Sequence, residues 1–182
     1  MPLASIVLIV FVSVFTAAAA VIDYRTRRIP NFLTIPAFLA GIVFQIAFHW
    51  HEPAKLLDPV QGFAVGFGTL FVLWIIGGGG GGDVKLMGAL SVWLGFRMTL
   101  YVLILSTVFV VIGTGVVILL STMTSGFRKT KNKYLSKSIT EGTSKTPVIE
   151  TLSDRQGRRL MTYALPVALA CWVVLAWVHL KP

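Results

Sequence analysis

Two aspartates, Asp23 and Asp83, are the residues of this sequence best placed for chemistry. Asp23 directly follows the apolar run 3–22, and Asp83 directly precedes the apolar run 84–96. Carboxylates at the edge of a hydrocarbon layer are costly, and by default they indicate function. Two carboxyl groups brought close together do not both ionise readily, so one keeps a proton while the other remains a base. Such a pair can activate a water molecule and protonate a leaving amine without a covalent intermediate.

Each aspartate also has a simpler explanation. Asp23 stands next to Arg25, Arg27 and Arg28, with which it could form an ion pair at the membrane interface. Asp83 comes directly before an apolar run and could cap a helix. Neither residue is persuasive alone, and the functional interpretation depends on both lying at the same membrane face.

Six consecutive glycines, residues 77–82, stand immediately before Asp83. No strand precedes them, so they do not form a dinucleotide-binding turn. A phosphate-binding loop does not fit either, because Asp83 and Val84 separate Gly82 from Lys85. The tract is then either a flexible connection between helices or a stretch where an extended substrate can approach the backbone beside Asp83.

Other chemistry is poorly supported. His49, His51 and His179 fall on the membrane side away from both aspartates, and His49, His51 and Glu52 do not converge on a helix end. We therefore expect no metal and no cofactor. The one cysteine, Cys171, allows neither a disulfide nor a CxxC zinc site, and we expect it to be a small core or lipid-facing residue.

The composition predicts an all-α, polytopic membrane protein. Of the 182 residues, 55% are hydrophobic and 13% are charged, whereas a soluble domain has about 25% charged residues. The apolar residues gather in blocks, most of them long enough to cross a bilayer. These blocks are residues 3–22, 32–48, 60–76, 84–96, 98–123 and 160–180. We expect about six transmembrane helices in a single membrane domain, 1–182, with a basic, poorly ordered loop at 124–159.

Several local features refine this prediction. The run from Ala17 to Ala20 could serve as a signal-peptide cleavage site, but the arginines that follow favour a retained spanning helix. Pro30 suits a turn and Asn31 could cap the second helix. Gly62 and Gly66 have the small-xxx-small spacing of closely packed helices.

Basic residues set the predicted orientation, because cytoplasmic loops carry an excess of Lys and Arg. The loops after the first, third and fifth blocks hold most of them: Arg25, Arg27, Arg28, Lys85, Arg128, Lys129, Lys131, Lys133, Lys137, Lys145, Arg155, Arg158 and Arg159. The opposite side holds Lys55, Arg97 and Lys181. Both termini are therefore expected outside, and both aspartates at the cytoplasmic face. The net charge of +9 then suits anionic lipids rather than nucleic acid.

Three segments together resemble the type IV prepilin peptidase family. Residues 23–31, Asp-Tyr-Arg-Thr-Arg-Arg-Ile-Pro-Asn, resemble its first aspartate motif. Residues 80–85, Gly-Gly-Gly-Asp-Val-Lys, resemble its second, a G-x-G-D motif followed by x-K. Residues 163–170, Tyr-Ala-Leu-Pro-Val-Ala-Leu-Ala, are similar to the P-Y-x-P-A motif of its last helix, with Thr162 in the position of the first proline.

The resemblance implies an aspartic endopeptidase that removes basic leader peptides from pilin-like precursors at the cytoplasmic face of a prokaryotic inner membrane. Asp23 and Asp83 would be the catalytic pair. The residues that would bind substrate or shape the site are Gly80, Gly82, Lys85, Pro30 and Asn31. The sequence resembles the short, peptidase-only branch associated with tight-adherence (Flp) pili. It lacks the cysteine-rich segment of two-domain members, so we do not expect methylation.

Two other functions compete with this one. In a small cation-coupled transporter, the glycine tract would mark a discontinuous helix and Asp83 would bind the cation. A noncatalytic membrane protein of pilus assembly is the third interpretation. The sequence does not define an oligomeric state.

Overall fold

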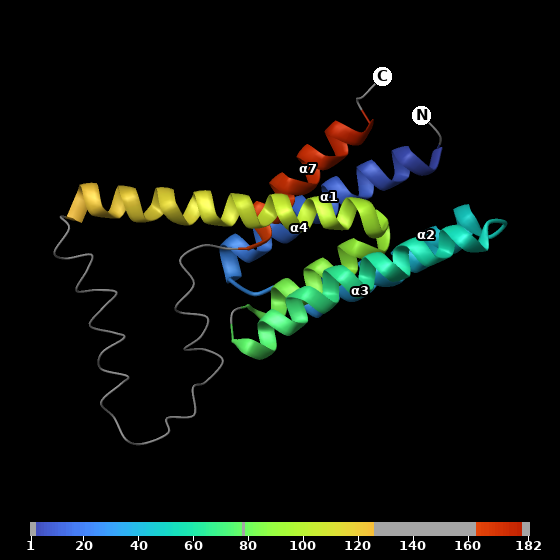
Figure 1. The fold of residues 1–182 in the computed structure, drawn as a ribbon, viewed down its shortest axis with the longest axis horizontal. Helices are drawn as coiled ribbons and strands as arrows, with labels where there is room; N and C mark the ends of the chain where they lie inside the picture. The colour runs from blue at the N-terminus through green and yellow to red at the C-terminus, as the bar shows by residue number, and fades with distance from the viewer. Residues whose placement is uncertain (1–2, 78, 126–162, 180–182) are drawn as a thin grey trace, which may run out of the picture. The chain divides into compact units, whose positions relative to one another are not determined.

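The computed structural model describes residues 3–77, 79–125 and 163–179, and within them all regular structure is α-helical. The helices are α1 (Leu3–Thr26), α2 (Asn31–His49), α3 (Pro53–Ile76), α4 (Gly81–Ser125) and α7 (Ala164–His179) (Figure 1). The contacts divide the chain into one unit of Met1–Phe109 with Thr162–Pro182, and a second of Val110–Met161. The first unit carries the site and is described below. Of the second, the described part is the end of α4.

The predicted multi-pass class is confirmed. Helices α1, α2, α3 and α4 are long and apolar enough to cross a membrane, and α7 is a shorter apolar helix. Helices suit this setting because they satisfy their backbone hydrogen bonds within one segment. The count of six spans and the sides of the termini remain predictions. The predicted loop 124–159 begins with the last two residues of α4, and the rest of it lies outside the described residues.

Helix α4 contains the boundary between the predicted fourth and fifth blocks. Its backbone leaves helical geometry at Gly95, which has a φ of 72° and a ψ of −177°. Figure 1 shows the ribbon turning back after this point. Two polar side chains satisfy the interrupted backbone: Gln45 of α2 donates to the Val92 carbonyl at 2.8 Å, and Asp58 of α3 accepts from the Phe96 N–H at 3.3 Å. A break at membrane depth requires such partners.

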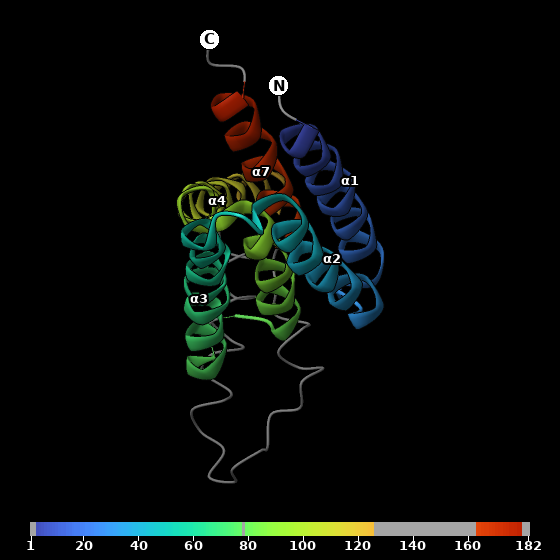
Figure 2. The same ribbon diagram turned by 90° about the vertical axis from the view of Figure 1, so that its right-hand side faces the viewer.

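Helices α3 and α4 pack as the glycine spacing predicts. A Cβ added to Gly62 would lie 2.7 Å from the carbonyl carbon of Gly95, and one added to Gly66 would collide with the Ser91 hydroxyl. Only glycine lets the two backbones approach this closely. In Figure 2 the first part of α4 lies between α3 and α2, and the Trp93 indole N–H donates to the Ala37 carbonyl of α2 at 2.8 Å.

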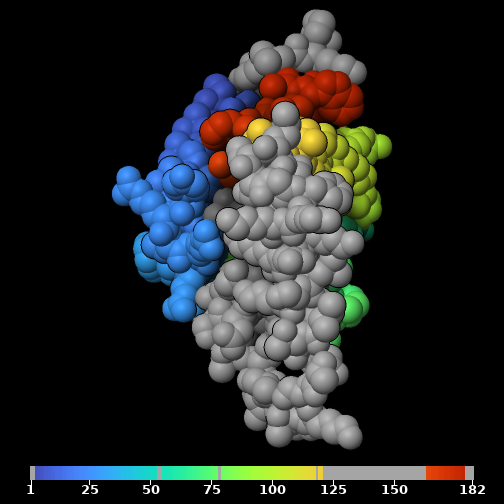
Figure 3. All heavy atoms as spheres, turned by 90° about the vertical axis from the view of Figure 1, so that its left-hand side faces the viewer, coloured from blue at the N-terminus to red at the C-terminus, as the bar shows by residue number. Residues whose placement is uncertain are grey.

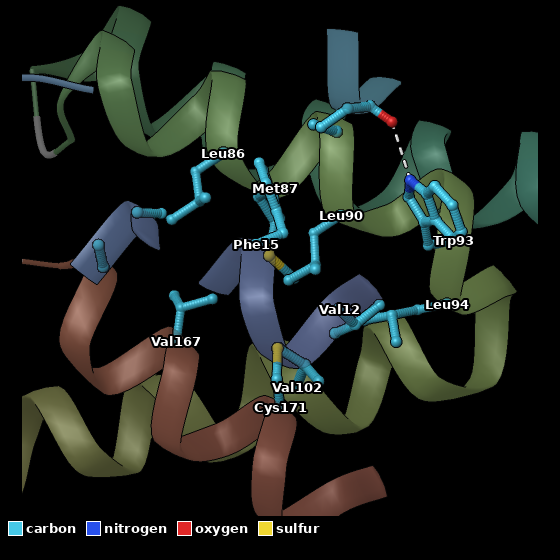
Figure 4. Close-up of a cluster of buried hydrophobic side chains, with 14 of the residues drawn as sticks. Val12, Phe15, Leu86, Met87, Leu90, Trp93, Leu94, Val102, Val167 and Cys171 are labelled. Carbon is cyan, nitrogen blue, oxygen red and sulfur yellow. Dashed lines mark hydrogen bonds between the residues drawn. The ribbon is translucent and has the colours of Figure 1, made fainter. Parts of the chain in front are cut away.

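The core of this unit lies where α1, α4 and α7 meet. Helices α1 and α7 lie side by side (Figure 3). Figure 4 shows the buried apolar side chains that join these helices: Val12, Phe15, Leu86, Met87, Leu90, Val102, Val167 and Cys171. Cys171 is therefore a core residue, which was one of its two predicted environments. Burial of these side chains fixes α7 against α1, and this also positions the first residues of α7.

The start of α2 corrects one prediction. Asn31 is the first residue of α2 and does not cap it, since the preceding position is held by Pro30 with a φ of −76° and a ψ of 148°. Proline fixes its own φ in this range, so it directs the chain from α1 into α2 without a side-chain cap. The Asn31 side chain is thereby released for a contact with another helix, described below.

Candidate functional site

Asp23 lies in the last turn of α1 and is buried, with 4% of its surface exposed. Its Oδ2 accepts a hydrogen bond of 3.2 Å from the N–H of Ala164, the first residue of α7. Helix α1 ends just beyond it, because Arg27 adopts left-handed geometry (φ 51°) and donates its N–H to the Asp23 carbonyl at 2.8 Å. The carboxylate is therefore held between two helix ends.

The simpler explanation of Asp23 as an interfacial ion pair is wrong. Within the described ranges, Arg25, Arg27 and Arg28 are exposed and Asp23 forms no ion pair with them. Their exposure is expected of arginines at a membrane surface, since the guanidinium remains hydrated there. The buried carboxylate turns instead toward α7.

Asp83 is the third residue of α4 and is also buried, with 7% of its surface exposed. Its Oδ2 accepts the N–H of Gly80 at 3.2 Å, while the Gly80 carbonyl accepts the N–H groups of Asp83 at 2.9 Å and Val84 at 3.3 Å. The Asp83 side chain thus makes one half of a capping box, from the third helical position back to the N-cap N–H, while Gly80 has no side chain to make the other half. The predicted N-cap role of Asp83 is wrong: Asp83 satisfies the helix start from within the first turn.

The glycine tract is exposed where it leaves α3 and packs against protein where it enters α4. Gly77 terminates α3 in left-handed geometry (φ 91°), which glycine adopts without strain. Gly80 is buried, and a Cβ added to Gly82 would be in ordinary contact with Ile29, 3.5 Å from its Cβ. Gly82 therefore lies against the segment that joins α1 to α2.

A second contact joins the same two segments. The Lys85 ammonium donates to the Asn31 Oδ1 at 2.8 Å, and both side chains are exposed. Pro30 lies directly before Asn31 and sets the path of this segment. The segment of Pro30 and Asn31 is thus joined to the segment of Gly82 and Lys85, which is distant in sequence and also carries Asp83.

The start of α7 lies against Asp23. Ala164 contacts Asp23, as described above, and the preceding residue, Tyr163, is partly buried. The Tyr163 phenol oxygen lies 3.4 Å from the hydroxyl oxygen of Ser106 in α4. Figure 1 shows the end of α1 and the starts of α4 and α7 at the same end of the bundle.

Sequence reasoning gave no role to three residues of this site, Tyr163, Ala164 and Ser106. Tyr163 and Ala164 open the segment that resembles the last family motif, which was the available signal. Ser106 is a polar residue within an apolar block, and such residues in a membrane span usually have a partner. Among the described residues, no group of three or more His, Cys, Asp or Glu side chains could hold a metal ion.

These features define a class: a polytopic helical membrane protein with two buried carboxylates anchored at separate helix ends, an arrangement suited to acid–base chemistry. The chain belongs to the type IV leader peptidase family, which it matches over residues 9–116, more than half of its length and including both aspartates.

Curated relatives agree with this assignment. The chain is 31% identical over 100 residues to a prepilin leader peptidase/N-methyltransferase of Escherichia coli K12, covering 51% of this chain and 43% of that protein. It is 32% identical over 105 residues to one of Xanthomonas campestris, covering 54% and 36%, and 34% identical over 98 residues to one of Burkholderia pseudomallei, covering 50% and 31%. The match thus spans less than half of each relative. No solved structure matches the chain significantly.

Proposed function

We propose that this protein is an aspartic endopeptidase that cleaves leader peptides from pilin-like precursors, with Asp23 and Asp83 as its catalytic pair. The observation that carries the proposal is the burial of both carboxylates at helix ends, Asp23 against the start of α7 and Asp83 in the first turn of α4, each with a backbone N–H partner. Membership of the leader peptidase family supplies the substrate class, since the relatives are named prepilin leader peptidases.

The reaction needs nothing beyond the two carboxyl groups and water. One ionised aspartate takes a proton from a water molecule as the water oxygen attacks the scissile carbonyl carbon. The other, protonated aspartate stabilises the developing negative charge on the carbonyl oxygen. A proton then passes to the leaving nitrogen, the C–N bond breaks, and the two carboxyl groups again share one proton.

Gly80, Gly82, Lys85, Pro30 and Asn31 are proposed to shape the substrate site. They belong to the two segments at the starts of α4 and α2, which the Lys85–Asn31 hydrogen bond joins on the exposed side. Lys85 repels a basic leader, so we assign it to bracing the site and not to holding the leader's charge.

We further propose that cleavage occurs at the cytoplasmic face of a prokaryotic inner membrane, in a protein of the short tight-adherence type. The excess of Lys and Arg in the loops on the side of Asp23 and Asp83 supports this orientation. Anionic lipid headgroups are the proposed partners of the basic segment 124–159, at about 1 kcal/mol for each Lys or Arg near the surface.

Co-expression with a pilin-like precursor tests this function. The wild-type chain should convert the precursor to a shorter product on a gel, whereas Asp23→Asn and Asp83→Asn should each leave it uncleaved while still inserting in the membrane. Asp58→Asn is the matched control, because Asp58 caps a helix break elsewhere and asparagine keeps its acceptor oxygen. Cleavage by either Asp23→Asn or Asp83→Asn at the wild-type level would refute the proposed pair.

A further inference from the structure

Three arginines lie where α1 ends and the chain leads into α2, in residues 24–32, which we call the α1–α2 corner. Arg25 belongs to the last turn of α1, and Arg27 and Arg28 follow it. All three are exposed, and the one ion pair within residues 3–77, 79–125 and 163–179 joins Lys55 to Glu52. The three positive charges of the corner therefore have no counter-ion in the described chain.

Arg27 is held in a backbone conformation that suits glycine better than arginine. Its φ is 51°, and no other non-glycine residue of the described ranges has a positive φ. The Arg27 N–H donates to the Asp23 carbonyl at 2.8 Å, which is a common left-handed end of a helix, and glycine or asparagine usually takes this position. An arginine here costs stability, and because its side chain is exposed, packing within the described chain does not offset that cost. This combination points to a partner of the guanidinium outside the chain.

Hydrogen bonds make the α1–α2 corner a defined turn. Thr26 Oγ1 lies 2.9 Å from the carbonyl oxygens of both Ile22 and Arg28, and it accepts the Arg28 N–H at 3.4 Å. Pro30 then fixes the path of the chain into α2. The backbone that carries the arginines is thus tied to the last turn of α1, which also holds Asp23.

Two aromatic residues indicate that the α1–α2 corner lies at a membrane boundary. Tyr24 and Phe32 each have 74% of their surface exposed, and aromatic rings concentrate where the hydrocarbon meets the headgroups. The corner also joins the ends of α1 and α2, which are both long and apolar enough to cross a membrane. The anions at this level are lipid phosphates, which a guanidinium binds through paired N–H donors. A lipid headgroup therefore fits the corner better than a soluble anion does.

We infer that the α1–α2 corner binds the anionic headgroup of a membrane lipid through Arg25, Arg27 and Arg28, and that the bound headgroup offsets their charge beside Asp23. This site is separate from the basic segment 124–159. The second half of the inference rests on the proposed function: three arginines without a counter-ion would repel a basic leader from the carboxylate that is to cleave it, and a bound anion removes that repulsion.

Lipid titration of the purified full chain tests the binding site without reference to cleavage. Dioleoyl phosphatidylglycerol and dioleoyl phosphatidylcholine would be titrated in parallel, with bound lipid counted by native mass spectrometry. Each arginine near an anionic surface contributes about fivefold in affinity, so Arg27→Gly should weaken phosphatidylglycerol binding about fivefold. The triple variant Arg25→Gln, Arg27→Gly, Arg28→Gln should weaken it about a hundredfold. Because glycine relieves the left-handed strain, Arg27→Gly should also raise Tm by about 2–4 °C in lipid-free detergent, which separates lost binding from misfolding.

Arg97→Gln is the matched control, because Arg97 is also exposed but follows the Gly95 break in α4 and is not part of the α1–α2 corner. It should leave phosphatidylglycerol binding unchanged. An equal loss in Arg97→Gln, equal binding of the two lipids, or displacement of phosphatidylglycerol by millimolar inorganic phosphate would overturn the inference.

Cleavage of a pilin-like precursor by the full chain in nanodiscs tests the second half. The wild-type chain should cleave faster in phosphatidylcholine discs that also contain phosphatidylglycerol than in pure phosphatidylcholine discs, and the triple variant should cleave equally fast in both. A wild-type rate that does not depend on phosphatidylglycerol would refute the charge-offsetting role. If the wild-type chain cleaves no precursor in either disc, the proposed function fails, while the titration still decides whether the headgroup site exists.

Discussion

At the scale of single residues, the two aspartates combine a structural and a chemical role. Asp83 accepts the Gly80 N–H at the start of α4, and Asp23 satisfies the first N–H of α7. Each of these bonds uses one carboxylate oxygen, Oδ2. Asparagine in either position keeps an oxygen acceptor of the same shape, so the substitution separates the two roles: the helix starts remain satisfied while acid–base exchange is lost.

The Lys85–Asn31 hydrogen bond gives a testable prediction at this scale. Lys85→Met and Asn31→Ala should each lower the free energy of unfolding, and a double-mutant cycle should give a coupling of about 0.5–1 kcal/mol, since the pair is exposed. Thermal unfolding in detergent would measure it. Lys55→Met is the control, because Lys55 pairs with Glu52 on the same helix start and should not couple to Asn31. Strict additivity of Lys85→Met and Asn31→Ala would contradict the bracing role.

At the scale of the helices, the sequence predicted their class and one of their contacts. Apolar block lengths predicted helices that could span a membrane, and the Gly62–Gly66 spacing predicted close packing of α3 against another helix, which in the structure is α4. The start of α3, at Pro53 and not at residue 60, was missed, because Lys55 and Asp58 interrupt the apolar pattern. Asp58 is accommodated in this helix because its carboxylate accepts the Phe96 N–H. This partner lies 38 residues further along the chain, so the local apolar pattern does not indicate it.

The same limit applies to the site. Residues near Asp23 and Asp83 in the sequence could be predicted, because they stand in the same short segments as the aspartates. The contribution of α7 could not, since the Ala164–Asp23 contact joins residues 141 positions apart. The capping role of Asn31 failed for a related reason: the side chain finds a better partner in Lys85 than in its own helix.

The α3–α4 contact gives a prediction at the scale of elements. Gly62→Ala should destabilise the protein by about 1–3 kcal/mol, because the new methyl group meets the Gly95 backbone, which cannot move aside as a side chain could. Gly68→Ala is the matched control on the same helix: nothing lies within 4 Å of its added Cβ, and alanine favours helix by up to about 1 kcal/mol. Equal stability of the two variants in detergent unfolding would contradict this packing.

At the scale of the whole molecule, the proposed chemistry depends on orientation in the membrane. We predict that both termini lie outside and that residues 25–28 face the cytoplasm. Reporter fusions at Ser144, which lies outside the described residues, and at Lys55 should then report opposite sides of the membrane. Ser144 should report the cytoplasmic side, because basic loops are retained there. Fusions that report the same side would remove the shared face on which the aspartate pair depends.

The most direct test of the central claim is the cleavage rate of the purified double variant, Asp23→Asn with Asp83→Asn, beside the two single variants. When two groups act as one catalytic unit, removing either one abolishes the contribution of both. Each single change should therefore slow cleavage by about 10²–10⁴-fold, and the double change should slow it no further. Folding of each variant would be checked by its helical circular dichroism. A double variant whose loss equals the product of the single losses, or a single variant with substantial activity, would contradict the account.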